Sequence, residues 1–171
     1  MRLLIPNMVT LLGLCVGLTS IRMAIEGRFE YALIAIASAA VIDGLDGRMA
    51  RLLKASSRFG AELDSLSDFV CFGVAPAVVL YLWGFSSASS FGWIMVLVFA
   101  LAAALRLARF NVALDDRSKP VWENAFFVGV PVPAGAILLL LPLYLHGLGL
   151  PKSWLATPML GVYAIAIAAS W

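Results

Sequence analysis

Long runs of apolar residues occupy most of this chain and constrain its fold more than any other feature. Six segments are each of a length that can cross a bilayer as a helix: 3–25, 31–54, 60–83, 91–112, 130–148 and 155–171. The runs do not alternate between apolar and polar residues, and in lipid only helices or closed barrels satisfy the backbone. We therefore expect an all-α, polytopic membrane protein with about six transmembrane helices.

Composition agrees with a bilayer as the solvent. The chain is 63% hydrophobic and only 13% charged, whereas soluble domains carry about 25% charged residues. The connections are short, so a single membrane-embedded domain over residues 1–171 is expected. The last segment reaches Trp171 while still apolar and without a flanking charge, so truncation of the chain at its C-terminus remains an open alternative. The net charge of +2 gives no indication of nucleic-acid binding.

Positive charge is concentrated on one side of the six predicted helices. Of the 12 Lys and Arg residues, all but Arg22, Arg28 and Lys152 fall on the side that holds the N-terminus. These are Arg2, Arg48, Arg51, Lys54, Arg58, Arg106, Arg109, Arg117 and Lys119. Because cytoplasmic loops carry an excess of Lys and Arg, this side is expected to face the cytoplasm.

Four aspartates lie close together in the second and third predicted helices. Asp43 and Asp46 are three residues apart, and Asp64 and Asp68 are four apart, so each pair shares one face of its helix. The short loop between the helices makes them antiparallel neighbours, with both pairs near the cytoplasmic end. Four carboxylates so close repel one another in a low dielectric, and divalent cations such as Mg²⁺, Mn²⁺ or Ca²⁺ relieve that repulsion. The pattern predicts a metal site of the kind that holds two ions in phosphoryl transfer.

Two other interpretations of these aspartates stay open at this point. They could form structural ion pairs with Arg48, Arg51 and Arg58, although that would account for a single pair better than for four aspartates on facing helices. They could also form the intramembrane cation site of a transporter, because ionisable groups inside spanning helices commonly mark ion pathways.

Eight positions between residues 43 and 68 match the pattern D-x-x-D-G-x-x-A-R-x8-G-x-x-x-D-x-x-x-D. They are Asp43, Asp46, Gly47, Ala50, Arg51, Gly60, Asp64 and Asp68. On these residues the chain resembles the CDP-alcohol phosphotransferases. Cation transport gives no reason for the spacing of the glycines, Ala50 and Arg51, so the resemblance argues against the transporter.

The resemblance implies a six-helix membrane fold, a homodimer and a dinuclear Mg²⁺ or Mn²⁺ site that faces the cytoplasm. By that resemblance the four aspartates hold the metal ions, and Asp68 also takes the proton of the acceptor hydroxyl. Gly47, Ala50, Arg51 and Gly60 would line the site for CDP.

The start of the first predicted helix adds two polar candidates. Asn7 and Thr10 are three residues apart and share one face at the cytoplasmic end. Their side chains could hydrogen-bond a nucleotide, or they could cap the helix. We expect both to belong to the CDP site.

The acceptor site is expected on the fourth predicted helix. Arg106 and Arg109 share one face there, with Asn111 as a polar neighbour, and two arginines can bind a carboxylate or a phosphate. The segments 107–111, 72–77 and 127–134 resemble the bacterial, serine-accepting branch of the family. That resemblance implies transfer of a phosphatidyl group from CDP-diacylglycerol to L-serine in the bacterial inner membrane. A sister enzyme that uses glycerol 3-phosphate or an inositol compound stays open, because a phosphorylated acceptor would also need a basic pocket.

Overall fold

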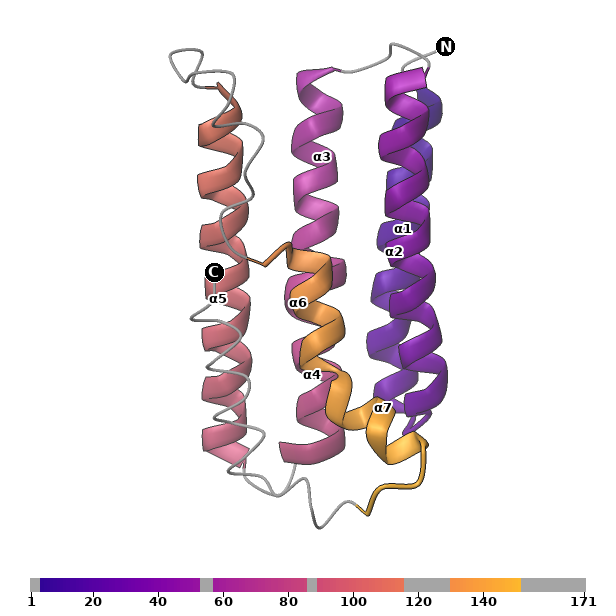
Figure 1. Ribbon diagram of the computed structural model, residues 1–171, viewed down its shortest axis with the longest axis vertical. Helices are drawn as coiled ribbons and strands as arrows, with labels where there is room; N and C mark the ends of the chain where they lie inside the picture. Colours follow the sequence, from indigo (N-terminus) through magenta and orange to yellow (C-terminus); the bar gives the residue numbers. More distant parts are fainter. Residues whose placement is uncertain (1–3, 53–56, 86–88, 116–129, 152–171) are drawn as a thin grey trace.

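Every regular element in the described part of the chain is a helix, and the long helices run side by side in one bundle (Figure 1). The computed structural model describes residues 4–52, 57–85, 89–115 and 130–151. Two long helices form the first hairpin, α1 (Leu4–Ile25) and α2 (Phe29–Leu52). Their connection turns at Gly27, whose φ of 76° lies in the left-handed region that glycine adopts at little cost. The predicted helices 3–25 and 31–54 are confirmed to within two residues.

A long, continuous helical stretch follows, and it contains two π-helical segments. It consists of α3 (Arg58–Asp68), η1 (Phe69–Val74), α4 (Ala75–Leu80) and η2 (Tyr81–Phe85). The Ser57 side chain caps its start by accepting a hydrogen bond of 3.0 Å from the backbone N–H of Gly60. Helix η1 begins directly after Asp68, and π-helical turns often occur at functional sites, so this position is consistent with a site at Asp68.

The fourth predicted helix is α5 (Ser89–Asp115), which extends beyond the predicted 91–112 at both ends. The fifth predicted helix, 130–148, is wrong as a single element. In the structure this segment divides at Leu140 into α6 (Val132–Leu139) and α7 (Leu141–Gly147), since Pro142 has no N–H to donate to the helical hydrogen bonds. Helix α6 begins near mid-height of the bundle, so α6 and α7 cover only its lower half (Figure 1). The sixth predicted helix, 155–171, lies outside the described residues.

Three of the described helices are long and apolar enough to cross a membrane: 7–25, 58–84 and 90–112. Helix α2 falls short of that measure because Asp43, Asp46 and Arg48 interrupt its second half. The chain is therefore a helical membrane protein, and three spans are identified by length and composition in the part of the chain that the structure describes.

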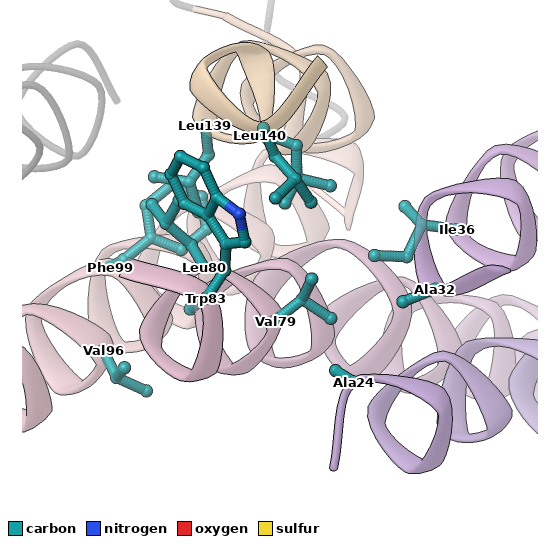
Figure 2. Packing of buried hydrophobic residues seen from close by; sticks show 12 residues of the cluster. Ala24, Ala32, Ile36, Val79, Leu80, Trp83, Val96, Phe99, Leu139 and Leu140 are labelled. Carbon is teal, nitrogen blue, oxygen red and sulfur yellow. The ribbon is translucent and has the colours of Figure 1, made fainter. Parts of the chain in front are cut away.

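The larger of two clusters of buried apolar residues lies in the half of the bundle away from the aspartates. There Leu80 and Trp83 lie beside Phe99 of α5 and Leu139 of α6, and Val79 lies toward Ala32 and Ile36 of α2 (Figure 2). A second cluster lies nearer the aspartates and includes Cys71, Phe72, Ala103, Val132 and Ala136. Lipid tails are as apolar as these side chains, so close packing rather than removal of apolar surface from water holds such helices together.

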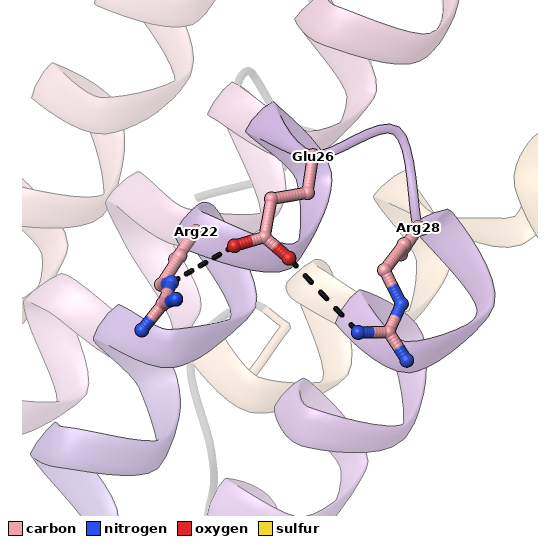
Figure 3. A network of polar contacts seen from close by, with 3 residues as sticks. All are labelled: Arg22, Glu26 and Arg28. Atoms are coloured by element: carbon pink, nitrogen blue, oxygen red, sulfur yellow. Dashed lines mark hydrogen bonds and ion pairs between the residues drawn. The ribbon is translucent and has the colours of Figure 1, made fainter.

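The turn between α1 and α2 carries a small charged network (Figure 3). Arg22 Nε lies 2.9 Å from Glu26 Oε1, and Arg28 lies 4.0 Å from the other oxygen of that carboxylate. Arg28 also covers the ring of Tyr31 at 4.2 Å. All of these groups are exposed, so the network contributes little to stability. It lies at the opposite end of the hairpin from the aspartates.

Helix α1 approaches η1 most closely at Gly17. A Cβ atom built there would overlap Cys71 Sγ and lie 3.3 Å from the Cys71 Cα atom. The Cys71 thiol donates to the carbonyl oxygen of Gly13, one turn earlier on α1, at 3.6 Å. Small residues on α1 therefore let it lie directly against the helix that follows Asp68.

We expect Gly17→Ala to destabilise the protein by about 1–3 kcal/mol, because the new methyl group overpacks this contact. Thermal unfolding in detergent measures the effect. Gly44→Ala is the matched control, since a Cβ at Gly44 meets nothing within 4 Å. Adding Cys71→Ala to Gly17→Ala should recover part of the loss. Equal melting temperatures for Gly17→Ala and the wild type would show that the helices do not approach this closely.

Candidate active site

Helices α2 and α3 bring three of the four predicted aspartates together. One carboxylate oxygen from each of Asp43, Asp64 and Asp68 can be chosen so that all lie within 4.8 Å of one another. The side chains of Asp43 and Asp68 are close enough to interact directly. The i, i+4 spacing on α3 and the antiparallel hairpin are what place these groups face to face. The predicted convergence of Asp43 with Asp64 and Asp68 is therefore present in the structure.

These three carboxylates fit a divalent cation. Mg²⁺ and Ca²⁺ take oxygen ligands at about 2.0–2.6 Å, so two ligands on opposite sides of an ion are roughly 4–5 Å apart. The three oxygens lie within 4.8 Å of one another, which is close enough for one ion to contact all three. Carboxylates are also the donor type that these hard ions prefer. The cluster could hold a metal ion, and its donors indicate Mg²⁺, Mn²⁺ or Ca²⁺.

Asp46 lies beside the cluster of three and is the most buried of the four aspartates. Only 4% of its surface is exposed. Its carboxylate accepts a hydrogen bond from the Thr10 hydroxyl on α1, and it is close enough to Asp43 for the two charges to interact. One small pocket is lined by Thr10, Gly13, Ala39, Asp43, Asp46, Ser67, Asp68, Cys71 and Phe72. Asp46 thus faces the same pocket as Asp43 and Asp68.

The two serines between Asp64 and Asp68 attach α3 to its neighbours. The Ser67 hydroxyl is buried and lies 3.5 Å from the backbone carbonyl oxygen of Thr10. The Ser65 hydroxyl bonds to the side chain of Asn111 on α5. Sequence reasoning missed both serines because they occupy unspecified positions of the aspartate pattern. The available signal was their position, because each serine is directly next to an aspartate of the pattern in the sequence.

Two of the residues predicted to bind CDP are neighbours in the structure. A Cβ atom at Gly60 would lie 3.1 Å from Asn7 Oδ1, so a larger residue at position 60 would press on the Asn7 side chain. A Cβ at Gly47 would meet nothing within 4 Å, which leaves open space on that side of α2. Thr10 lies in the pocket with Asp46. Ala50 and Arg51 lie in α2, but their side chains are outside the described part of the chain.

The residues predicted to bind the acceptor all lie on α5 and differ in how far they are exposed. Arg106 is half-buried, whereas Arg109 is exposed on the face of α5 that also exposes Leu105 and Val112. Asn111 is half-buried and points to Ser65. The two arginines therefore differ in exposure, and their joint role in acceptor binding stays a prediction. Of the block 127–134, residues 127–129 lie outside the described part, and Pro131 is the N-cap residue of α6.

The chain belongs to the CDP-alcohol phosphatidyltransferase family, which it matches over residues 3–170. It is 53% identical to the CDP-diacylglycerol–serine O-phosphatidyltransferase of Mycobacterium leprae over 134 residues, which are 78% of this chain and 44% of that protein. The protein of the same name from Mycobacterium tuberculosis H37Rv is 49% identical over 80% of this chain and 48% of its own length. That from Helicobacter pylori J99 is 38% identical over 81% of this chain and 56% of its own length.

The chain spans about half the length of the curated relatives it matches. The matched part includes most of the described helices, because it covers about four fifths of this chain. Membership of the family agrees with the aspartate pattern and with the apolar helices that carry it.

Proposed function

We propose that this chain transfers the phosphatidyl group of CDP-diacylglycerol to the hydroxyl of L-serine, with release of CMP. The observation that carries the proposal is the meeting of Asp43, Asp64 and Asp68 within 4.8 Å at one end of an apolar helical bundle. The family and the names of the most similar relatives support the choice of substrates. The acyl chains would stay in the bilayer while the diphosphate reaches the aspartates.

The aspartates have distinct proposed roles. Asp43, Asp46, Asp64 and Asp68 would hold two divalent ions, Mg²⁺ or Mn²⁺ with Ca²⁺ as a further candidate. When bound, such ions neutralise charge on the diphosphate and so make CMP a better leaving group. The carboxylate of Asp68 would accept the proton of the serine hydroxyl, because a neutral hydroxyl is a weak nucleophile.

The chemical step is a single displacement at phosphorus. The serine oxygen bonds to the phosphorus that carries diacylglycerol, the bond from that phosphorus to the bridging oxygen of CMP breaks, and CMP leaves with the electron pair. The serine proton passes to Asp68. We favour direct attack over a phosphatidyl-enzyme intermediate, since no serine, cysteine or histidine in the aspartate pattern is paired with a base as a nucleophile would be.

The proposed CDP site consists of Asn7, Thr10, Gly47, Ala50, Arg51 and Gly60. The contact between Asn7 and Gly60 supports a shared role at the start of α1 and α3, and the open space beside Gly47 would let a ligand approach the backbone. Arg106, Arg109 and Asn111 are the proposed acceptor residues. Half-buried Arg106 is the strongest of these, because a partly desolvated guanidinium binds a carboxylate more tightly than an exposed one.

Location and assembly complete the proposal. The excess of Lys and Arg near the aspartate end favours a site that faces the cytoplasm. We propose that residues 1–171 form one catalytic domain in the bacterial inner membrane and that the protein acts as a homodimer, as the family resemblance implies.

A panel of acceptor alcohols tests the choice of serine. Purified protein is supplied with CDP-diacylglycerol, Mn²⁺ and either L-serine, glycerol 3-phosphate, an inositol compound or no alcohol, and CMP is measured. We expect release with serine alone. Release with another alcohol instead would assign the chain to a sister enzyme of the same family. Cation uptake into vesicles without any CMP release would favour the transporter.

A further inference from the structure

The spacer between the two aspartates of α3 reads Ser65-Leu66-Ser67, and its three side chains point in different directions. Leu66 is 63% exposed and Ser67 is buried toward α1. Ser65 faces α5, where its hydroxyl donates to Asn111 Oδ1 at 3.1 Å and accepts from Asn111 Nδ2 at 3.0 Å. The Asn111 amide is therefore held against the Ser65 hydroxyl.

This contact joins two parts of the proposed site. Ala103, Leu107 and Asn111 recur every fourth residue, so they form one face of α5. That face packs on the stretch that carries the aspartates: Leu107 packs against the cluster around Cys71 and Phe72, and the Ala103 Cβ lies 3.0 Å from where a Cβ of Gly73 would be. Ser65 and Asn111 continue the same seam toward the aspartates with a polar contact. Arg106 lies on α5 immediately beside this seam.

We infer that Ser65 and Asn111 form a positioning pair, which holds α5 in register with α3 and so sets Arg106 relative to Asp64 and Asp68. The inference rests on the proposed function and assigns Asn111 a different role within it. Asn111 acts on the acceptor through the placement of α5, and its amide does not contact the acceptor. The geometry supports this because the amide already has a partner beside Asp64.

A double-mutant cycle separates positioning from direct contact. Ser65→Ala, Asn111→Ala and the double variant are compared with the wild type for the KM of serine and the KM of CDP-diacylglycerol. Each single substitution should raise the KM of serine by a similar factor, about 10- to 100-fold, because small displacements of a reacting pair are costly. The double variant should be no worse than either single one, and the KM of CDP-diacylglycerol should change little.

The opposite pattern would overturn the inference. If Asn111 contacts serine directly, Asn111→Ala will be far more damaging than Ser65→Ala, and the two effects will multiply. Ser65→Thr keeps the hydroxyl and should restore a KM near that of the wild type. Ser38→Ala is the matched control, since in the described part of the chain the Ser38 hydroxyl bonds within α2, to the Ile34 carbonyl oxygen at 2.8 Å.

Thermal unfolding of the same four proteins keeps this test separate from the proposed function. The losses in melting temperature should be non-additive, because either substitution removes the same contact. A wild-type protein that releases no CMP with any alcohol would remove the proposed function and the acceptor role of the pair together. Additive losses in melting temperature would overturn the pair itself, whatever the activity.

Discussion

Asp68→Asn should abolish CMP release while CDP-diacylglycerol still binds. The substitution keeps the shape of the side chain but removes the carboxylate that we propose takes the serine proton. General-base catalysis contributes about 10²–10⁴-fold in rate, and the loss should be at least of that order because Asp68 also belongs to the carboxylate cluster. Steady-state CMP release and equilibrium binding of CDP-diacylglycerol measure the two effects separately.

Glu62→Gln is the matched control for this variant. Glu62 is on the same helix as Asp68, but it is exposed and is not one of the three clustered carboxylates. It loses the same charge by the same chemical change, so its turnover should stay close to that of the wild type. Near-normal turnover in Asp68→Asn would remove Asp68 from the role of base.

Asp43→Asn should lose most of the affinity for Mn²⁺. Asp43 is the residue of α2 that meets both Asp64 and Asp68 of α3, so its carboxylate closes the cluster. Residues that merely support a metal ligand change affinity by about 10–100-fold, and the loss of a ligand should exceed that range. Mn²⁺ binding, measured by the electron paramagnetic resonance signal of the free ion, needs neither substrate nor turnover.

Two further variants calibrate the effect on metal affinity. Glu30 lies in the first turn of α2, at the end of that helix opposite to Asp43. Glu30→Gln should therefore leave the Mn²⁺ affinity unchanged. Thr10→Val removes the hydroxyl that bonds to Asp46 and should have an intermediate effect. If Asp43→Asn binds Mn²⁺ as tightly as the wild type, the three carboxylates do not form the metal site.

Sequence patterns predicted the convergence of the aspartates because the spacing of Asp64 and Asp68 matches a helical turn. The short loop between the second and third helices then placed Asp43 opposite them. Residue spacing and loop length suffice to predict a contact between two helices that one short loop connects. The predicted start of the third helix, residue 60, lies two residues after the observed start of α3 at Arg58.

Contacts between distant segments could not be predicted in the same way. Ser65 and Asn111 are 46 positions apart, and no spacing rule connects them. Arg106 and Arg109 share a helical face by spacing, yet only the packing of α5 decides that one is half-buried and the other exposed. The division at Leu140 was missed because a run of leucines continues across it, and hydropathy does not register the missing N–H of Pro142.

The most direct test of the whole account is the balance of products from the wild-type protein. Purified protein in detergent, given CDP-diacylglycerol, L-serine and Mn²⁺, should release CMP and phosphatidylserine in equal amounts. A chelator that removes Mn²⁺ should stop both, and added Mn²⁺ should restore both. Failure to form phosphatidylserine under these conditions, or formation that a chelator leaves unchanged, would contradict the claim that the clustered aspartates form a metal-dependent phosphatidyl-transfer site.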